Sequence, residues 1–193
     1  MKVVAFNSSP RKGGNTERLI KAVLEPLTEA GIETELVRIG GKPLHGCLAC
    51  NKCRERQDGR CVVTSDAMNE YLEKMWQADG ILLGSPTYFA DVNAEMKALI
   101  DRSGYVALAN GAKLRRKVGA AVVAVRRGGA THVFDSMNHL FQINQMVIPG
   151  SSYWNMGYGL QPGDVEGDEE ALHNMRNLGE NMAWLMKAIA AAK

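Results

Sequence analysis

The chain has 193 residues and lacks the features that would place it in a membrane or outside the cell. No stretch approaches the ~20 apolar residues that are needed to span a bilayer. The first ten residues carry one basic side chain and a short apolar run, which predicts a strand rather than a signal peptide. We therefore expect a cytoplasmic protein that does not act at a membrane.

A strong charge of one sign is also missing, because the formal net charge is only +2. Basic residues gather in a single short run between Lys113 and Lys117, which is typical of a solvated approach to a strand. We expect no nucleic-acid partner. With 46% hydrophobic and 23% charged residues, the chain has an ordinary globular composition and enough length to bury a core without disulfides.

Cysteine is absent except in one short stretch, where four cysteines follow the spacing C-x2-C-x2-C-x7-C: Cys47, Cys50, Cys53 and Cys61. Thiols stay reduced in the cytoplasm, so this cluster favours metal or redox chemistry over structural disulfides. Four thiolates in one loop can hold an iron–sulfur cluster. Two alternatives remain open: zinc, with His45 in place of one thiolate, and free thiols or a disulfide switch.

Apolar strand-like runs alternate with amphipathic helical runs along the chain. The pattern predicts strands at residues 2–6, 33–39, 80–84, 118–125 and 145–148. It predicts helices at residues 15–30, 66–77 (with Asp66 as N-cap), 91–103, 131–144 and 168–191. This alternation predicts a three-layer, doubly wound α/β fold with a five-stranded parallel sheet. We expect one domain over residues 1–193, with a cysteine-rich insertion at about 40–65.

The loop after the first strand contains small, hydroxyl and glycine residues just before a helix. Such a loop turns backbone N–H groups toward an anion at the helix N-terminus. Both the GxxxxGK[ST] and the GxGxxG patterns are absent, which disfavours nucleoside triphosphates and dinucleotides there. A single terminal phosphate fits better, with neutral donors and one charge from Ser8, Ser9, Asn15, Thr16 and Arg11. The alternative is an ordinary turn with a capping Asn or Thr.

Two further loops follow strands whose carboxyl ends should meet the first loop, where ligands bind in such sheets. In residues 84–89, Tyr88 or Phe89 could stack on a flat heterocycle. The loop after the strand at 118–125 brings paired arginines and glycines: Arg126, Arg127, Gly128 and Gly129. These arginines would meet negative charge on a ring or a nucleotide phosphate, or else they are solvated surface charges.

The first loop, S-x-P-[RK]-x-x-G-N-T, resembles the FMN-phosphate loop of the flavodoxin-like NADPH-dependent FMN reductases. The matching residues are Ser9, Pro10, Arg11, Gly14, Asn15 and Thr16. The motif G-[ST]-P-x-Y at 84–88 and the helix motif K-x-x-[IL]-D-R at 97–102 resemble flavin contacts of the same family. The cysteine spacing resembles that of the iron–sulfur flavoproteins.

The resemblance implies a flavodoxin-like sheet of order 2-1-3-4-5 that binds FMN at its carboxyl edge. It implies a flavin oxidoreductase that takes electrons from NAD(P)H and passes them to an acceptor the sequence does not identify, through a [4Fe–4S] cluster on the four cysteines. The implied flavin contacts beyond the first loop are Pro86, Thr87, Tyr88, Phe89 and the loop 126–129. A homodimer or homotetramer is expected, with Tyr153, Trp154 and Tyr158 as candidates to cover a neighbour's flavin. The rival interpretations are a non-enzymatic electron carrier and a thiol or metal redox sensor.

Overall fold

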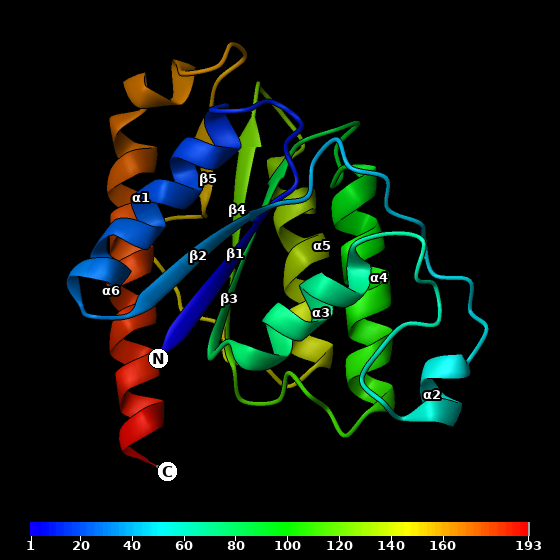
Figure 1. Ribbon diagram of the computed structural model, residues 1–193. Coiled ribbons are helices and arrows are strands. Elements are labelled where there is room, and N and C mark those ends of the chain that lie inside the picture. Colours follow the sequence, from blue (N-terminus) through cyan, green and yellow to red (C-terminus); the bar gives the residue numbers. More distant parts are fainter. Residues whose placement is uncertain (193) are drawn as a thin grey trace.

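A computed structural model describes residues 1–192 of the chain, which form one five-stranded parallel sheet in the order β2-β1-β3-β4-β5 (Figure 1). The strands are β1 (Lys2–Asn7), β2 (Glu33–Arg38), β3 (Gly80–Pro86), β4 (Val118–Val125) and β5 (Met156–Tyr158). The flavodoxin-like fold and its predicted strand order are confirmed.

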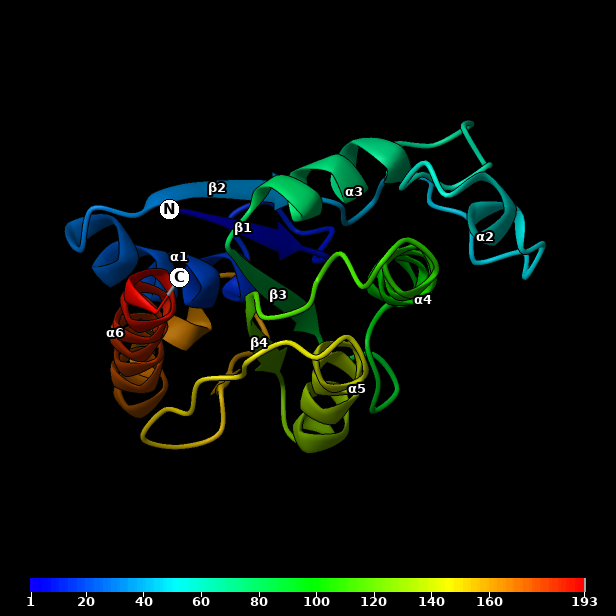
Figure 2. The ribbon, with the colours of Figure 1, turned by 90° about the horizontal axis from the view of Figure 1, so that it is seen from below.

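Helices cover both faces of the sheet, as Figure 2 shows along the strands. On one face lie α1 (Asn15–Glu29) and α6 (Glu169–Ala191), and on the other lie α3 (Met68–Gln77), α4 (Ala94–Ala109) and α5 (Ala130–Ile143). A short α2 (Lys52–Arg56) lies in the cysteine stretch, and a 3-10 turn, η1 (Asp164–Gly167), precedes α6. No helix within residues 1–192 is long and apolar enough to cross a bilayer.

The two helical layers bury two separate hydrophobic clusters, one on each face of the sheet. All eight residues of β4 are buried, as expected of a central parallel strand with helices on both sides. Helices therefore cover both faces of the sheet at its middle strands, and only the ends of those strands can reach solvent. This leaves the loops at the carboxyl edge as the place for a ligand.

The predicted fifth strand, residues 145–148, is wrong. Val147 makes only an isolated parallel bridge with Val118, and β5 instead pairs Met156–Tyr158 with Val123–Val125. The N–H of Val147 bonds the Lys117 carbonyl and its own carbonyl accepts the N–H of Gly119. The next ladder bond would come from residue 149, which is a proline without an N–H. The chain therefore leaves the sheet edge and returns at Met156, within a stretch expected to be loop.

Two helix boundaries also differ from the prediction. The helix predicted to end at residue 103 continues to Ala109, because Gly104 leaves the room that Leu140 fills; a Cβ there would lie 2.8 Å from Leu140 Cδ1. Asp66 is not the N-cap of α3, which begins at Met68 after Ala67. Oδ1 of Asp66 still accepts the N–H of Met68 at 3.2 Å, while its Oδ2 forms a buried ion pair with Arg102 on α4.

Candidate functional site

The three predicted loops meet at the carboxyl edge of the sheet and enclose a hollow of about 150 Å³. We call it the edge pocket. It is lined from the loop after β1, the loop after β3, the end of β4 and the loop after β5, by Ser9, Arg11, Asn15, Thr16, Pro86, Thr87, Tyr88, Ala124, Arg126, Gly159 and Leu160. Eight of these eleven residues belong to the predicted cofactor set, so the structure brings eight of the fifteen predicted residues to one pocket.

The N-terminus of α1 opens into this pocket and carries no side-chain cap. Gly14 occupies the N-cap position and supplies no acceptor, while Glu17 reaches back to the N–H of Gly13 at 3.0 Å. Glu17 thus bonds the residue before the N-cap rather than closing a capping box, so the N–H groups of the first turn keep room for an external anion. Ser9 and Thr16, both almost fully buried, add hydroxyl groups beside it.

The Glu17 carboxylate lies near this anion position, but its charge is balanced. It pairs with Lys21 at 3.0 Å and with Arg38. Burial alone would raise the pKa of Glu17, but Lys21, the N–H of Gly13 and Arg38 outweigh it and hold that pKa below its ordinary value. The carboxylate therefore fixes the loop without leaving an uncompensated negative charge.

Some first-loop residues position the loop rather than line the pocket. Ser8 is fully buried and donates both its N–H and its hydroxyl to the Gly84 carbonyl, at 3.0 and 3.2 Å. Asn15 lines the pocket, yet its amide is held by the loop after β5, donating to the Gln161 carbonyl and accepting from the Gly163 N–H, both at 2.9 Å. Pro10 and Gly14 lie on the loop but not at the pocket wall.

The loop after β3 places a buried hydroxyl without a partner at the pocket wall. The N–H of Thr87 bonds the Ala124 carbonyl at 2.9 Å, while Thr87 Oγ1 is buried and has no hydrogen-bond partner among the described residues. Such orphaned groups are rare in folded proteins and call for a missing partner. A ligand in the edge pocket would supply one.

Beyond Thr87 the chain makes a tight turn closed by a bridge between Tyr88 and Asp91. Its two central residues, Phe89 and Ala90, have φ of +48° and +63°, which is strained for residues other than glycine. The turn points Tyr88 into the pocket lining, whereas the Phe89 side chain is fully exposed and lies outside it. Of the two predicted stacking residues, Tyr88 is the one that lines the pocket.

In the third loop only Arg126 lines the edge pocket. Arg127 and Gly128 are exposed and lie outside it. Gly129 begins α5 with φ of +88° and touches the turn of the second loop, since a Cβ there would lie 2.8 Å from Ala90. This contact fixes the second and third loops against each other.

All four cysteines line a second hollow, between the cysteine stretch and α4, which we call the cysteine hollow. It measures only about 20 Å³, roughly the room of one water. Cys53 is buried, Cys61 is half-buried, and Cys47 and Cys50 are exposed. The exposed side of the cysteine hollow, with Cys47 and Cys50, would have to move outward to admit a group larger than water.

Side chains of α3 and α4 hold the cysteine stretch. Asn69 bonds both backbone groups of Cys61, at 2.8 and 2.9 Å. Asn110, which caps α4, accepts from the Gly59 N–H at 2.8 Å, and the Trp76 indole donates to the Gly59 carbonyl at 2.9 Å. These bonds hold the cysteine stretch in place, and the stretch contains one short helix, α2.

The thiols are not bonded to one another, since all four cysteines are free. In the part of the chain that the structure describes, no three Cys, His, Asp or Glu side chains are grouped closely enough to hold one metal ion. A cubane spreads its four thiolates over four different irons, so its ligands need not converge on one point. Burial, with the neighbouring thiols Cys61 and Cys47, raises the pKa of Cys53, while its backbone N–H donors act the other way.

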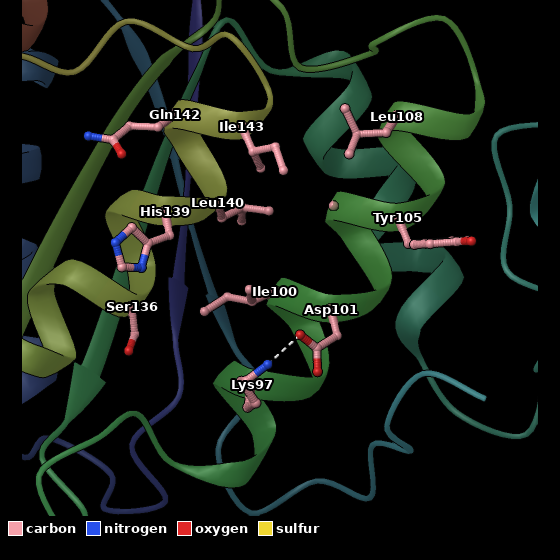
Figure 3. Close-up of a pocket in the computed structure, with 11 residues that line it drawn as sticks. Lys97, Ile100, Asp101, Tyr105, Leu108, Ser136, His139, Leu140, Gln142 and Ile143 are labelled. Carbon is pink, nitrogen blue, oxygen red and sulfur yellow. Dashed lines mark hydrogen bonds and ion pairs between the residues drawn. The ribbon is translucent and has the colours of Figure 1, made fainter. Parts of the chain in front are cut away.

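The residues of the helix motif at 97–102 do not line the edge pocket, so their expected flavin contact stays a prediction. Lys97 and Asp101 pair with each other at 2.5 Å on the surface of α4. They line a third hollow of about 740 Å³ between α4 and α5, whose apolar wall includes Leu140 and Ile143 (Figure 3). Apart from residues of this motif, no predicted site residue lines this groove, and within residues 1–192 only Tyr105 lines both it and the cysteine hollow.

A family model of NADPH-dependent FMN reductases matches residues 1–161. The chain belongs to this family. It is thus an FMN-binding flavin oxidoreductase. It is 40% identical to an iron–sulfur flavoprotein of Methanocaldococcus jannaschii over 98% of this chain and 99% of that one. It is also 40% identical to an iron–sulfur flavoprotein of Methanosarcina thermophila over 79% of this chain and 78% of that one.

The fold is also similar to that of a solved flavodoxin-like protein. A WrbA-like protein from Agrobacterium tumefaciens superposes with a TM-score of 0.66 over 97% of both chains, at 17% identity. The resemblance to the reductase family that the loops indicated is therefore confirmed at the level of family and fold.

Sequence reasoning missed three residues that line the edge pocket: Ala124, Gly159 and Leu160. Gly159 follows β5 directly, and its N–H bonds the Val125 carbonyl at 2.9 Å. Had the fifth strand been assigned to residues 156–158, the loop after it would have joined the other loops at the carboxyl edge.

Proposed function

We propose that this chain oxidises NAD(P)H with FMN held in the edge pocket, and that the four cysteines hold a [4Fe–4S] cluster that relays electrons to an acceptor. The observation that carries the proposal is the edge pocket itself. It joins an uncapped helix N-terminus to an orphaned buried hydroxyl, on a chain of the FMN reductase family.

The residues present fit FMN. The phosphate would lie at the N-terminus of α1, among the first-turn N–H groups and the hydroxyls of Ser9 and Thr16, with Arg11 as the nearby charge. The flat ring would extend toward Thr87 and Tyr88, with Arg126 opposite at the end of β4. Arg11 would also fix the pocket rim, because its Nη1 donates to the Leu160 carbonyl at 2.8 Å.

Bound FMN supplies the redox chemistry: it takes two electrons as hydride and can release them singly. The chain contributes binding, orientation and electrostatics. Thr87 would donate to or accept from a polar edge of the ring, and the Arg126 guanidinium would stabilise negative charge that builds up there. The exposed Tyr88 leaves one side of the pocket open to a nicotinamide.

The donor set of the cysteine hollow fits a cluster. Four thiols and a buried arginine line one hollow, and a backbone N–H of Ala49 donates to Cys47 Sγ at 3.4 Å. Hydrogen bonds to sulfur are among the features that tune such clusters. Two 40%-identical relatives are named iron–sulfur flavoproteins, which supports the same assignment.

We further propose a homodimer or homotetramer. Tyr153, Trp154 and Tyr158 are exposed aromatic residues that would cover the pocket of a neighbouring copy. Tyr153 and Trp154 already pack edge-to-face, with ring centroids 4.6 Å apart. The acceptor would approach the cysteine stretch, whose outer cysteines are exposed.

The test is an anaerobic preparation examined by visible spectrum, by iron and sulfide analysis, and by rapid mixing with NADH or NADPH. We expect flavin absorbance, about four irons and four sulfides per chain, and bleaching of the flavin band on mixing. Flavin that is not bleached by either nucleotide would favour the electron carrier over the reductase. Protein that binds no added FMN would favour the thiol or metal sensor.

A further inference from the structure

Arg102 is among the largest fully buried side chains of the molecule, and no part of the edge pocket uses it. It projects from α4 with 1% of its surface exposed. A buried guanidinium loses its hydration, so it persists only where partners compensate it. The partners of Arg102 therefore indicate the role of its positive charge.

One partner is the Asp66 carboxylate, which Nη1 of Arg102 contacts at 2.5 Å. Neither side chain of this ion pair reaches solvent to any extent. Arginine stays protonated in proteins, so the guanidinium is charged, and the Asp66 carboxylate compensates that charge in the interior.

The other partners stand at the two ends of the cysteine stretch. Arg102 donates from Nη1 to the His45 carbonyl at 3.1 Å and from Nη2 to the Val63 carbonyl at 3.2 Å. His45 lies two residues before Cys47, and Val63 lies two residues after Cys61. Asp66 also accepts from the His45 N–H at 2.9 Å. The ion pair thus ties both ends of the cysteine stretch to α4, and both ribbon views place that stretch beside α4 (Figures 1 and 2).

One polar atom of Arg102 is left over. Nε is buried and has no hydrogen-bond partner among residues 1–192, and Arg102 lines the cysteine hollow together with all four thiols. Asp66 does not line that hollow. Arg102 therefore brings a buried positive charge to the wall that it shares with the four cysteines.

We propose that Arg102 is the positioning residue of the cysteine site: it closes the 45–63 stretch and offers its charge and its Nε–H to the sulfur atoms of a bound cluster. This inference rests on the proposed cluster. A cluster with four thiolates is negatively charged, and taking up one electron makes it more so. A buried cation therefore favours the reduced form and raises the reduction potential. Arg102 acts through charge and position and takes part in no bond change.

The test compares two variants with the wild type. Arg102→Gln/Asp66→Asn removes both buried charges together, which avoids leaving one unpaired in the interior. Arg102→Lys keeps a charge but loses the Nε–H and the forked geometry. The matched control is Glu25→Gln/Arg176→Gln, which removes a surface ion pair of 2.9 Å between α1 and α6 on the other face of the sheet.

We measure iron and sulfide per chain, flavin per chain, and the cluster midpoint potential in an anaerobic titration. The double variant should bind FMN as the wild type does, while its one-electron equilibrium shifts at least tenfold toward the oxidised cluster, about 59 mV downward. Arg102→Lys should shift it in the same direction by less, and should lose iron to a chelator several-fold faster. The control should match the wild type.

The inference is overturned if the wild type holds iron and both variants keep its midpoint potential and its rate of iron loss. The proposed function would still stand in that case. A wild type that holds FMN but no iron or sulfide after anaerobic reconstitution would overturn the proposed cluster and this inference with it. If the double variant does not fold, Arg102→Lys decides by the same two readouts.

Discussion

At the scale of single residues, six buried side-chain polar atoms within residues 1–192 lack a hydrogen-bond partner, and two of them belong to residues that line the candidate sites. These are Oγ1 of Thr87, a residue that lines the edge pocket, and Nε of Arg102, a residue that lines the cysteine hollow. Leaving such an atom unpaired costs about 1–3 kcal/mol in the free protein. That cost is recovered when a ligand provides the partner, so each atom couples folding to binding.

Thr87→Val tests this coupling, because it keeps the shape of the side chain and removes the orphaned hydroxyl. The free protein should be as stable as the wild type or slightly more stable, since no hydrogen bond is lost. FMN binding should weaken about tenfold, the size of one net hydrogen bond. Thermal unfolding of the free protein and a flavin fluorescence titration measure the two effects.

The control for this swap is Thr28→Val at the far end of α1. Its hydroxyl is already bonded, to the Leu24 carbonyl at 3.0 Å, and lies outside the edge pocket. FMN affinity should be unchanged. A Thr87→Val protein that binds FMN as tightly as this control would show that the hydroxyl has no ligand partner.

At the scale of elements, the loop after β1 keeps its shape because the end of β2 lies directly against it. Gly40, just past β2, donates its N–H to the Asn7 carbonyl at 3.2 Å. A Cβ on Gly40 would lie 2.3 Å from the backbone of Ser8 and Ser9, where no real contact is found. This position therefore tolerates only glycine unless the loop moves.

We expect Gly40→Ala to push the first loop out of place, lowering FMN affinity at least tenfold and destabilising the fold by about 1–3 kcal/mol. Gly46→Ala is the matched control, since it lies in the same segment and a Cβ there would meet nothing within 4 Å. Denaturant unfolding and FMN titration of both variants give the comparison. Equal behaviour of the two would mean that the loop is pliable and that β2 does not shape the site.

The helices, strands and loops also differ in how well the sequence predicts them. The sheet order followed from alternating apolar and amphipathic runs together with the resemblance, and the first two loops followed from residues whose chemistry is local. The fifth strand did not, because Val147 starts a pairing that Pro149 cannot continue. The extension of α4 through Gly104 depends on Leu140 filling the space, which is a tertiary contact.

Side-chain partners far apart in sequence were the least predictable part of the site. Arg102 fits a flavin-contact motif by its neighbours, yet its partners His45, Val63 and Asp66 place it at the cysteine hollow. Asp66 has the sequence signature of an N-cap and does accept the N–H of Met68, but it is also the counter-charge of Arg102. Only the packing of α4 against the cysteine stretch decides both roles.

At the scale of the whole molecule, the two candidate sites are built from different parts of the chain. The edge pocket and the cysteine hollow share no lining residue. One connection between them runs through the start of the cysteine stretch: Gly41 donates its N–H to Glu95 at 3.0 Å, and Asn93 donates to the Ser8 carbonyl at 2.6 Å. This arrangement predicts that one site can be emptied while the other keeps its function.

The double variant Cys47→Ser/Cys50→Ser tests whether the edge pocket works without the cysteine site. Both side chains are exposed, so the fold should be retained, but two thiolates are too few for a four-cysteine cluster. We expect loss of nearly all iron and sulfide, with FMN content and the rate of flavin bleaching by NAD(P)H within about twofold of the wild type, because the edge pocket holds its own contacts. Turnover with a one-electron acceptor should fall in the same variant, since electrons would then leave only from the flavin. If FMN is lost together with iron, the cysteine stretch supports the edge pocket through Gly41 and Asn93, and the two sites form a single cooperative unit.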